Sequence, residues 1–401
     1  MAERSKQNGL DSNAYENEKV VDMNCNGAMA RQPLKLSGIL NQFKSFDSTP
    51  VIGTEFPDVS LADWITAPNS DALLRDLAIT ISRRGVVFFR KQSDLTDSMQ
   101  KELAHRLGQL TGKPKSSTLH IHPLTNFDCG KDKTVHVIST SEKQNPAEDL
   151  FSNHNHRRGG NLGNWHSDIS YEQVPSDYTV LRLTELPQTG GDTLWASGYE
   201  VYDRISPPYR KFLSSLTANF AQVRYPMTAK TKNFQIYSDE RGSPENVGSD
   251  LKAVHPVIRT NPVTGWRSVY AVGNHFQSIN DLTQEESNQL HDWFLRLIAH
   301  NHDLQVRNRW QNPNDVGMSH FYLFVQTFSC GYFSLVAWML TNGRLAKMGY
   351  SAIWDNRSIY HAATFDFQGL GPRTGHRAVG IGERPFFSPG SLSRREALSL
   401  S

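Results

Sequence analysis

The chain has 401 residues, which is enough to bury a large core either as one large domain or as two modest ones. Its 42 basic and 40 acidic residues give a formal net charge of +2, which excludes the strongly basic surface of a nucleic-acid-binding protein. The three cysteines, Cys25, Cys129 and Cys330, are scattered and odd in number, which indicates neither a disulfide framework nor a zinc cluster.

The start of the chain lacks the basic and then apolar run of a signal peptide, and we expect a cytoplasmic protein. Residues 1–45 are predicted to be a disordered tail because their first part is polar and poor in aromatic side chains. A single domain is expected over 46–390, followed by a second short tail over 391–401.

The first predicted elements of the domain are a helix, a strand and another helix. Ser70 is expected to cap a helix whose apolar residues recur at helical spacing until Gly85. The continuous apolar run within 85–90 has the length of a strand and predicts one that is buried. The helix after it has an apolar stripe formed by Met99, Leu103 and Leu107.

Short strands separated by polar loops dominate the rest of the chain. They are expected over 120–123, 134–138, 178–183, 190–197 after a turn, 255–258, 268–272 and 305–311. A helix is predicted over 202–216, irregular chain from there to residue 246, and a further helix at the capping box of Thr283 and Glu286. This order of elements predicts a mainly β fold with flanking helices, a double-stranded β-helix or jelly-roll core.

The most informative stretch is Asn164-Trp165-His166-Ser167-Asp168-Ile169-Ser170-Tyr171. If it is a strand, His166 and Asp168 project from the same face, because residues i and i+2 share a face. An imidazole and a carboxylate are two thirds of the two-histidine, one-carboxylate arrangement that binds non-haem Fe(II). A hydrogen-bonded His–Asp pair without a metal is the structural alternative.

A second group of candidate residues lies far along the chain. His361 ends a run with strand character and could supply the third metal ligand, and Arg373 and Arg377 follow it. Guanidinium groups bind carboxylates bidentately and keep their charge in a partly dry pocket. The long polar loop 139–163 is a candidate lid, and we interpret its His154 and His156 as solvated.

Segment 317–351 is more apolar than the chain on either side of it. Its part 321–340 has no charged residue and the length of a membrane span. A single span inside such a β fold is implausible. A buried helix or an amphipathic excursion would account for the segment.

Four ordered motifs resemble the Fe(II)- and 2-oxoglutarate-dependent taurine (sulfonate) dioxygenase family, in its fungal form. They are Trp165-His166-Ser167-Asp168, Thr189-Gly190-Gly191-Asp192-Thr193-Leu194-Trp195, Trp354-Asp355-Asn356-Arg357 with His361, and Arg373 with His376-Arg377. The similarity extends over about 52–387 and includes His120-Ile121-His122-Pro123. The spacing of the motifs in the resembled family is matched when 317–351 is removed, so the resemblance implies that this segment is an atypical insertion, and a retained intron translated in frame would account for it.

The resemblance implies a role for each matching residue. His166, Asp168 and His361 would bind iron, Thr193 and Arg373 would bind the distal carboxylate of 2-oxoglutarate, and His122 and Arg377 would bind the sulfonate of the substrate. Thr125 and Leu162 stand where taurine-specific members have tyrosine and asparagine, which predicts a sulfonate other than taurine.

The implied reaction uses Fe(II), 2-oxoglutarate and O₂ to hydroxylate a small anionic substrate, most simply a sulfonate, without a nucleic-acid or membrane partner. A homo-oligomer is compatible with it. Hydroxylation of a carboxylate such as an aryloxyacetate is one alternative, and a catalytically impaired relic of the fold is another. A zinc hydrolase fits less well, because the arginines suit a keto acid better than an activated water.

Overall fold

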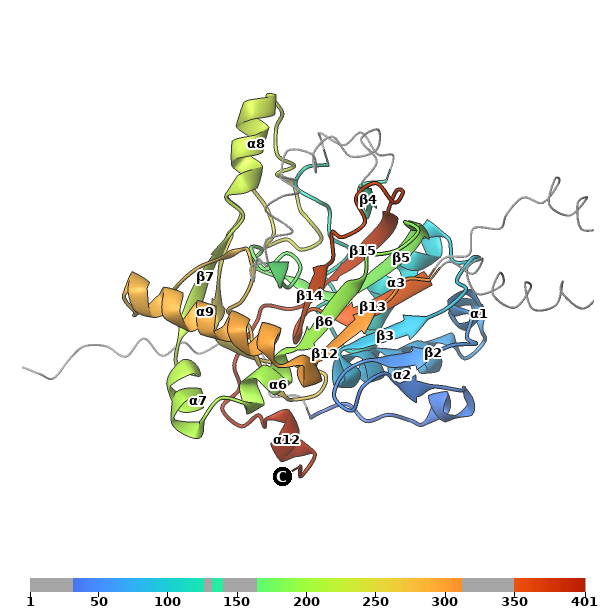
Figure 1. The fold of residues 1–401 in the computed structure, drawn as a ribbon, viewed down its shortest axis with the longest axis horizontal. Coiled ribbons are helices and arrows are strands. Elements are labelled where there is room, and N and C mark those ends of the chain that lie inside the picture. Colours follow the sequence, from blue (N-terminus) through green and yellow to red (C-terminus); the bar gives the residue numbers. More distant parts are fainter. Residues whose placement is uncertain (1–31, 126–131, 140–163, 312–349, 401) are drawn as a thin grey trace, which may run out of the picture.

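The structure, a computed structural model, describes residues 32–125, 132–139, 164–311 and 350–400 (Figure 1). Within these ranges the largest sheet has seven strands, in the order β1 (Phe46–Asp47), β2 (Thr54–Phe56), β3 (Val86–Phe89), β13 (Tyr350–Asp355), β5 (Ser176–Glu185), β15 (Thr374–Ile381) and β4 (Val135–Ser139). Neighbouring strands in it are antiparallel, apart from the parallel pair β2 and β3.

Three smaller sheets and the helices complete the described part of the chain. The sheets are β12 (Gln305–Asn308), β6 (Thr193–Ser197) and β14 (Ile359–Ala363); β11 (Phe276–Ile279), β7 (Thr217–Ala221) and β8 (Lys252–Pro256); and β10 (Arg267–Val269) with β9 (Ile258–Thr260). The α-helices are α1 (Leu61–Thr66), α2 (Ser70–Arg84), α3 (Asp97–Leu110), α6 (Gly198–Asp203), α7 (Pro207–Leu213), α8 (Arg224–Lys232), α9 (Gln284–His300) and α12 (Arg394–Ala397), and the 3₁₀ helices are η1 (Ile39–Gln42) and η3 (His302–Leu304).

Helices α2 and α3 cover the outer face of the large sheet. The apolar residues of the predicted stripe of α2 are buried against the sheet. Every residue of β3, within the sheet, is buried as well. α2 ends at Gly85 as predicted, because its φ of 81° suits glycine, and its N–H donates to the carbonyl of Ile81 at 2.6 Å. Side chains alternate along a strand, so Val87 meets the helices whereas Phe88 points to the inner face.

The inner face of the large sheet packs against the small sheet β12-β6-β14. One buried cluster contains Val86 and Phe88 of β3, Trp354 of β13 and Trp195 of β6. The rings of Trp195 and Trp354 meet edge to face, with centroids 5.8 Å apart. The two sheets therefore face each other across a shared core, in which strand β14 runs beside β6.

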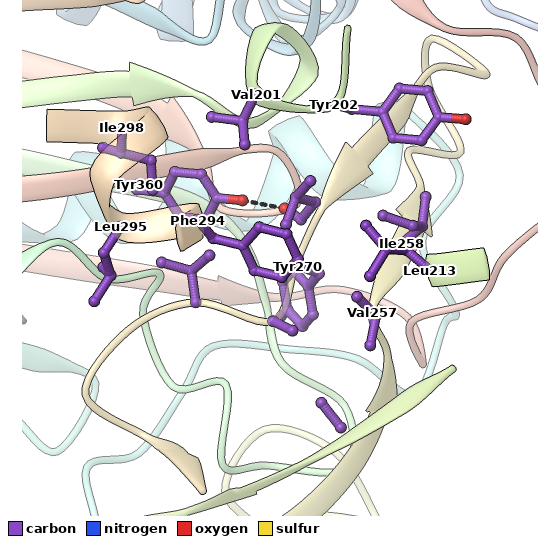
Figure 2. Close-up of a cluster of buried hydrophobic side chains, with 14 of the residues drawn as sticks. Val201, Tyr202, Leu213, Val257, Ile258, Tyr270, Phe294, Leu295, Ile298 and Tyr360 are labelled. Atoms are coloured by element: carbon purple, nitrogen blue, oxygen red, sulfur yellow. Dashed lines mark hydrogen bonds between the residues drawn. The ribbon is translucent and has the colours of Figure 1, made fainter. Parts of the chain in front are cut away.

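A separate apolar core supports the outer side of β14 (Figure 2). Tyr360 of β14 is buried in it, and its hydroxyl donates to the carbonyl of Val269. Phe294 of α9 and Tyr270 lie beside it, together with residues of α6 and β9. Since neighbouring residues of a strand point to opposite faces, burying Tyr360 here directs His361 toward the large sheet.

Several predicted elements differ in the structure. The helix expected over 202–216 is two short helices, α6 and α7, because Pro207 and Pro208 cannot continue a helix from α6. The stretch expected to be irregular contains β7 and α8. Residues 120–123 form no strand, and only Leu119 makes an isolated bridge there, with Gly380. The capping box of Thr283 and Glu286 is confirmed at the start of α9.

The ends of the predicted domain are more ordered than expected. Within 391–401, helix α12 contacts α6, and buried Arg394 donates to the carboxylate of Glu200 at 2.7 Å. At the N-terminal side, the N–H of Ser37 donates to Asp76 of α2. These side chains connect residues beyond the expected domain limits to its core.

The apolar segment 317–351 lies outside the described residues, apart from 350 and 351. These two belong to β13, where Ser351 pairs with Phe89 of β3 and with Arg182 of β5. An insertion would therefore end before residue 350. Within the described ranges, no helix has the length and apolar character that crossing a bilayer requires.

Candidate active site

The segment with His166 and Asp168 is held by an isolated bridge, so the predicted strand is wrong. The N–H of His166 donates to the carbonyl of His361 at 3.1 Å, and the N–H of His361 donates back at 2.9 Å. A turn begins at Asp168, and Ile169 has a φ of 48°, which a β-branched residue rarely adopts. The chain therefore leaves the small sheet immediately after Asp168.

His166, Asp168 and His361 nevertheless come together between the two sheets. One ligand atom from each lies within 4.8 Å of the others. The Nε2 atom of His361 is 3.8 Å from Oδ1 of Asp168, and the two imidazole rings have centroids 4.3 Å apart. Two imidazoles and one carboxylate gathered in this way are a donor set that suits a divalent iron.

The protonation of these three groups fits a metal site. Nδ1 of His166 lies 2.9 Å from the carbonyl of Asn164, which can only accept a hydrogen bond, so Nδ1 is the donor and Nε2 is the nitrogen that can face a metal. Burial, and next the neighbouring imidazole of His166, lower the pKa of His361 to about 3, so the His361 imidazole is neutral. Burial would raise the pKa of Asp168, but Arg377, followed by His361 and His166, outweighs it and holds the pKa below its usual range.

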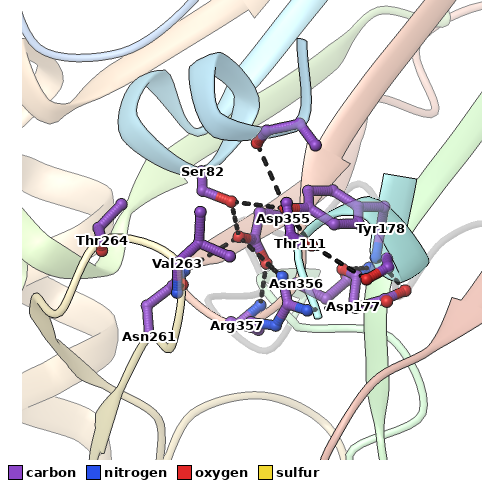
Figure 3. A network of polar contacts seen from close by, with 12 residues as sticks. Ser82, Thr111, Asp177, Tyr178, Asn261, Val263, Thr264, Asp355, Asn356 and Arg357 are labelled. Atoms are coloured by element: carbon purple, nitrogen blue, oxygen red, sulfur yellow. Dashed lines mark hydrogen bonds and ion pairs between the residues drawn. The ribbon is translucent and has the colours of Figure 1, made fainter. Parts of the chain in front are cut away.

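Buried polar side chains hold the turn that leads into β14 (Figure 3). The carboxylate of Asp355 accepts from the hydroxyl of Ser82 at 2.6 Å and from the amide of Asn261 at 2.9 Å. The guanidinium of Arg357 lies 3.3 Å from the same carboxylate and 4.9 Å above the ring of Tyr178. These contacts connect the turn to α2, to β5 and to the chain before β10, so the start of β14 is fixed.

Thr193 and Arg373, the predicted 2-oxoglutarate residues, are in contact. The Nη2 group of Arg373 donates to the Thr193 hydroxyl at 3.2 Å, and its Nε donates to the carbonyl of Gly191 at 2.9 Å. Gly191 has a φ of 68°, and a Cβ there would lie 3.0 Å from Cδ of Arg373. A glycine is therefore needed for the arginine to lie against this turn.

The Thr193 hydroxyl is arranged to donate a hydrogen bond. Its oxygen accepts from Arg373 and from the indole Nε1 of Trp310, at 3.1 Å, so its own hydrogen remains for another acceptor. Thr193 pairs with Ala363 of β14, which lies two residues beyond His361 on the same face. Thr193 thus lies on the strand beside that of His361 and one two-residue repeat, roughly 7 Å, further along it.

Arg377 and His122, the predicted substrate residues, lie near the other side of Asp168. Nη1 of Arg377 donates to Oδ1 of Asp168 at 2.7 Å, and Nη2 is 3.5 Å from Nδ1 of His136. The ring of His136 stacks on that of His122 at 4.5 Å, and Nε2 of His122 is 3.2 Å from the hydroxyl of Tyr225. A continuous row of polar side chains therefore leads from the triad to α8.

Arg377 is the fixed positive charge of this row. Burial, and next the charge of Arg377, lower the pKa of His136 to about 3, and burial, followed by His136, lowers that of His122 well below its usual value. Both imidazoles are therefore neutral at pH 7. The buried Nε of Arg377 has no hydrogen-bond partner among the described residues. A buried donor without a protein partner is expected where a bound anion is to accept its hydrogen bond.

Sequence reasoning did not identify His136, Tyr225 or Trp310 as site residues. His136 lay in a correctly predicted strand, where its polar side chain among apolar neighbours was a usable signal. Tyr225 lay in a stretch expected to be irregular, and Trp310 contacts Thr193 only in the tertiary structure. Of the two departures from the taurine pattern, Thr125 is described and its N–H donates to the carbonyl of His122, whereas Leu162 lies outside the described residues. The loop 139–163, with His154 and His156, also lies outside them, apart from Ser139.

A family model agrees with this arrangement. The model described as "Taurine catabolism dioxygenase TauD, TfdA family" matches residues 44–319. The match thus contains His166, Asp168 and Thr193 and ends before His361.

Individual relatives extend the similarity over most of the chain. An alpha-ketoglutarate-dependent dioxygenase of Penicillium shearii is 48% identical, over 92% of this chain and 96% of its own length. One of Neocamarosporium betae is also 48% identical, over 92% of this chain and 99% of its own length. An alpha-ketoglutarate-dependent sulfonate dioxygenase of Saccharomyces cerevisiae is 27% identical, over 86% of this chain and 68% of its own length.

Solved structures share the fold. A taurine dioxygenase from Burkholderia xenovorans superposes with a TM-score of 0.55 at 20% identity, covering 86% of this chain and 93% of its own. AAD-2, solved in complex with Mn(II) and N-oxalylglycine, gives a TM-score of 0.57 at 17% identity, covering 86% of this chain and 100% of its own.

Proposed function

We propose a reaction for this chain on the premise that it belongs to the taurine catabolism dioxygenase TauD, TfdA family and is a 2-oxoglutarate-dependent dioxygenase. The proposal is that it hydroxylates a small sulfonate at the carbon next to sulfur. It rests on one observation above all, which is that Arg377 contacts the triad carboxylate while Thr193, which Arg373 contacts, lies one two-residue repeat along the strand beside that of His361.

Each predicted site residue has a role in this proposal. His166, Asp168 and His361 would be the ligands of Fe(II), through two imidazoles and one carboxylate. The two facing sheets that carry them would be the two halves of a double-stranded β-helix. Arg373 with Thr193 and Arg377 with His122 would then hold two anions on different sides of one metal.

With Fe(II), 2-oxoglutarate and O₂ bound, the site would supply oxidative decarboxylation of the keto acid to succinate and CO₂, coupled to hydroxylation of the substrate. The protein's own part is to bind and orient. Arg373 would pair with the distal carboxylate of 2-oxoglutarate while the Thr193 hydroxyl donates to it. The apolar residues between the sheets, among them Trp195 and Trp354, would exclude water from the reacting groups.

Arg377 and His122 would bind the sulfonate. The guanidinium supplies the fixed charge, and the neutral imidazole supplies a donor, because Nδ1 of His122 accepts from the N–H of Leu124 and leaves the proton on Nε2. Once the carbon next to sulfur is hydroxylated, its C–S bond breaks. Sulfite leaves with the bonding electron pair, the hydroxyl loses its proton, and an aldehyde remains.

A carboxylate substrate is the second candidate, because Arg377 would pair with either anion. The relatives that are 48% identical carry names without a substrate, and the two named for sulfonates are 30% and 27% identical, so the names do not decide between the two anions. Since Thr125 and Leu162 replace the residues of the taurine pattern, taurine itself is not the expected substrate.

Sulfite release separates the two candidates. The iron-loaded enzyme would be incubated with 2-oxoglutarate and taurine, ethanesulfonate, isethionate or an aryloxyacetate, and both succinate and sulfite would be measured. We expect succinate and sulfite in equal amounts with at least one sulfonate. Succinate coupled only to the carboxylate would overturn the sulfonate proposal and leave the dioxygenase assignment intact.

The apolar segment before β13 bears on whether the encoded protein is active. We propose that segment 317–351 is an insertion and that a retained intron accounts for it. Residues 350 and 351 pair as part of β13, so the insertion would end before residue 350. The family match also ends at residue 319, near the start of segment 317–351. Sequencing transcripts across this region tests the idea: if every transcript contains these codons, the intron explanation is wrong, and an impaired relic becomes the reading to test by iron content and succinate formation.

A further inference from the structure

Asn356 lies at the centre of a buried hydrogen-bond network beside the triad. Its side chain is almost completely buried, on the turn between β13 and β14. The carbonyl Oδ1 accepts from the N–H of Asp168 at 3.2 Å and from the indole Nε1 of Trp354 at 3.0 Å. The amide Nδ2 donates to the hydroxyl of Thr179 at 2.7 Å and to the carbonyl of Asp177 at 3.3 Å. All four hydrogen-bonding positions of the amide are therefore used.

This amide can have only one orientation. The N–H of Asp168 and the indole of Trp354 can only donate, and the carbonyl of Asp177 can only accept. Rotating the amide by half a turn would place two donors against donors and leave an acceptor opposite an acceptor. Because these groups are buried, each loss would cost the full desolvation of an unpaired group.

The fixed amide determines where the Thr179 hydroxyl points. Thr179 accepts a hydrogen bond from Nδ2 of Asn356, so its single hydrogen is left for Oδ2 of Asp168, 3.1 Å away. Oδ2 is thereby occupied by a donor from β5. Oδ1, the other oxygen of Asp168, is the one that lies near His361 and Arg377.

The backbone of Asn356 holds the same segment. Its carbonyl accepts from the hydroxyl of Ser167 at 2.7 Å, so the residue between His166 and Asp168 is attached to it as well. This segment has a single bridge to His361 where a strand would have a ladder of bonds. The contacts with Asn356 therefore replace part of the missing ladder.

The network also reaches the third member of the triad. The indole of Trp354 donates to Asn356, and its ring packs against the imidazole of His361 with centroids 4.8 Å apart. A single side chain thus contacts the segment of Asp168 directly and the ring of His361 through one neighbour.

We propose that Asn356 is a positioning residue for the metal site, and that through Thr179 it orients the Asp168 carboxylate so that Oδ1 is the oxygen presented to the metal. The inference rests on the proposed function, because it takes the triad to be a metal site. Neither Asn356 nor Thr179 would contact the metal, 2-oxoglutarate or the substrate. Their effect would be to preset the carboxylate and the Trp354–His361 contact before the metal binds.

Binding of Mn(II) alone, followed by calorimetry and by the electron paramagnetic resonance signal of the bound ion, tests the proposal without turnover. We expect Thr179→Val, which keeps the shape and removes the hydroxyl, to weaken Mn(II) binding roughly 10–100-fold, as loss of partners to metal ligands does. Thr179→Ser should restore binding, because it restores the donor to Oδ2. Asn356→Ala should weaken binding at least as much as Thr179→Val.

Asn246→Ala is the matched control. Asn246 is also a buried asparagine, but its amide hydrogen-bonds to the backbone of Val174 and, among the described residues, makes no hydrogen bond to the triad or to the turn of Asn356. Its loss should lower the melting temperature while Mn(II) affinity stays at the wild-type value.

Wild-type affinity in Thr179→Val would overturn the positioning role, even if Asn356→Ala fails to fold. Equal weakening in Asn246→Ala, or no recovery in Thr179→Ser, would overturn it as well. If the wild-type chain binds no Mn(II), the proposed function falls together with this inference. If the wild-type chain binds Mn(II) and the variants bind it equally well, only the inference is overturned.

Discussion

The two faces of the large sheet differ in what holds them and in what they do. On the outer face, alternate residues of the strands, such as Val87 and Val180, pack against the apolar stripes of α2 and α3. On the inner face, the alternate residues include Thr179, Arg377 and His136, which contact the triad or one another. The same strands therefore serve as core on one side and carry the candidate site on the other.

This difference shows which interactions carry stability and which carry chemistry. The outer face is stabilised by apolar burial, which is not directional and scales with area. The inner face is stabilised by hydrogen bonds whose partners are buried, so each one is specific and costly to break. Substitutions on the two faces should therefore have separable effects.

The largest effect is expected for Asp168→Ala on the inner face. It removes the one carboxylate of the triad, so metal-dependent turnover should be abolished while far-ultraviolet circular dichroism stays that of the wild type. Iron content and succinate formation measure the loss. Asp71→Ala, which removes an exposed carboxylate paired with Arg106, should leave both unchanged. Appreciable succinate formation in Asp168→Ala would contradict the ligand assignment.

Leu103→Ala on the outer face should lower stability and leave metal binding intact. Leu103 of α3 is fully buried among the residues that cover the sheet, so its truncation should lower the free energy of unfolding by about 2–5 kcal/mol. Metal affinity of the folded protein should not change. Gln109→Ala, at an exposed position of the same helix, is the control for both measurements. A loss of metal affinity in Leu103→Ala would show that the two faces are coupled.

Arg373→Ala tests the cosubstrate side of the interior. Losing a charged hydrogen-bond donor should raise the KM for 2-oxoglutarate by roughly 10–100-fold, corresponding to about 1.5–3 kcal/mol. Steady-state kinetics at saturating substrate measure this change. Arg307, which pairs with Asp192 beside Thr193, provides the control, because a half-exposed ion pair contributes only about 0–1 kcal/mol. An unchanged KM in Arg373→Ala would remove this residue from the 2-oxoglutarate site.

Acid sensitivity should come from the region around the site, where buried histidines gather. Burial, followed by the charge of Arg259, lowers the pKa of His255 to about 3 from an ordinary 6.5, and its Nε2 lies 3.0 Å from the carbonyl of Ser170. Between these values the unfolded chain binds more protons than the folded one, so stability falls as the pH drops from 6.5 toward 3.

His255→Gln should therefore flatten this dependence. The slope of unfolding free energy against pH should fall by at most about 1.4 kcal/mol per pH unit, the value for one proton. Urea unfolding at several pH values between 4 and 7 measures the slope. Identical slopes in the variant and the wild type would show that His255 is not a source of the acid sensitivity.

Several elements were predictable because their signals are local. The apolar stripes of α2 and α3, the stop at Gly85, and the capping box at Thr283 and Glu286 each depend on residues within a few positions. The wrong predictions arose where contacts distant in the chain determine the local structure. The strand expected at His166 depended on a local pattern, but the chain there bridges to His361, which no local pattern contains.

The sequence by itself determined the chemical inventory of the site, since the motifs with His166, Asp168, Thr193, His361, Arg373 and Arg377 could be recognised from residue type and order. Only the tertiary structure decided how these residues are held. Asn356 and Thr179 act on Asp168 from positions distant in the chain, and His136 approaches Arg377 because β4 pairs with β15. The physical reason is that hydrogen bonds depend on position in space, whereas periodicity and capping depend only on position along the chain.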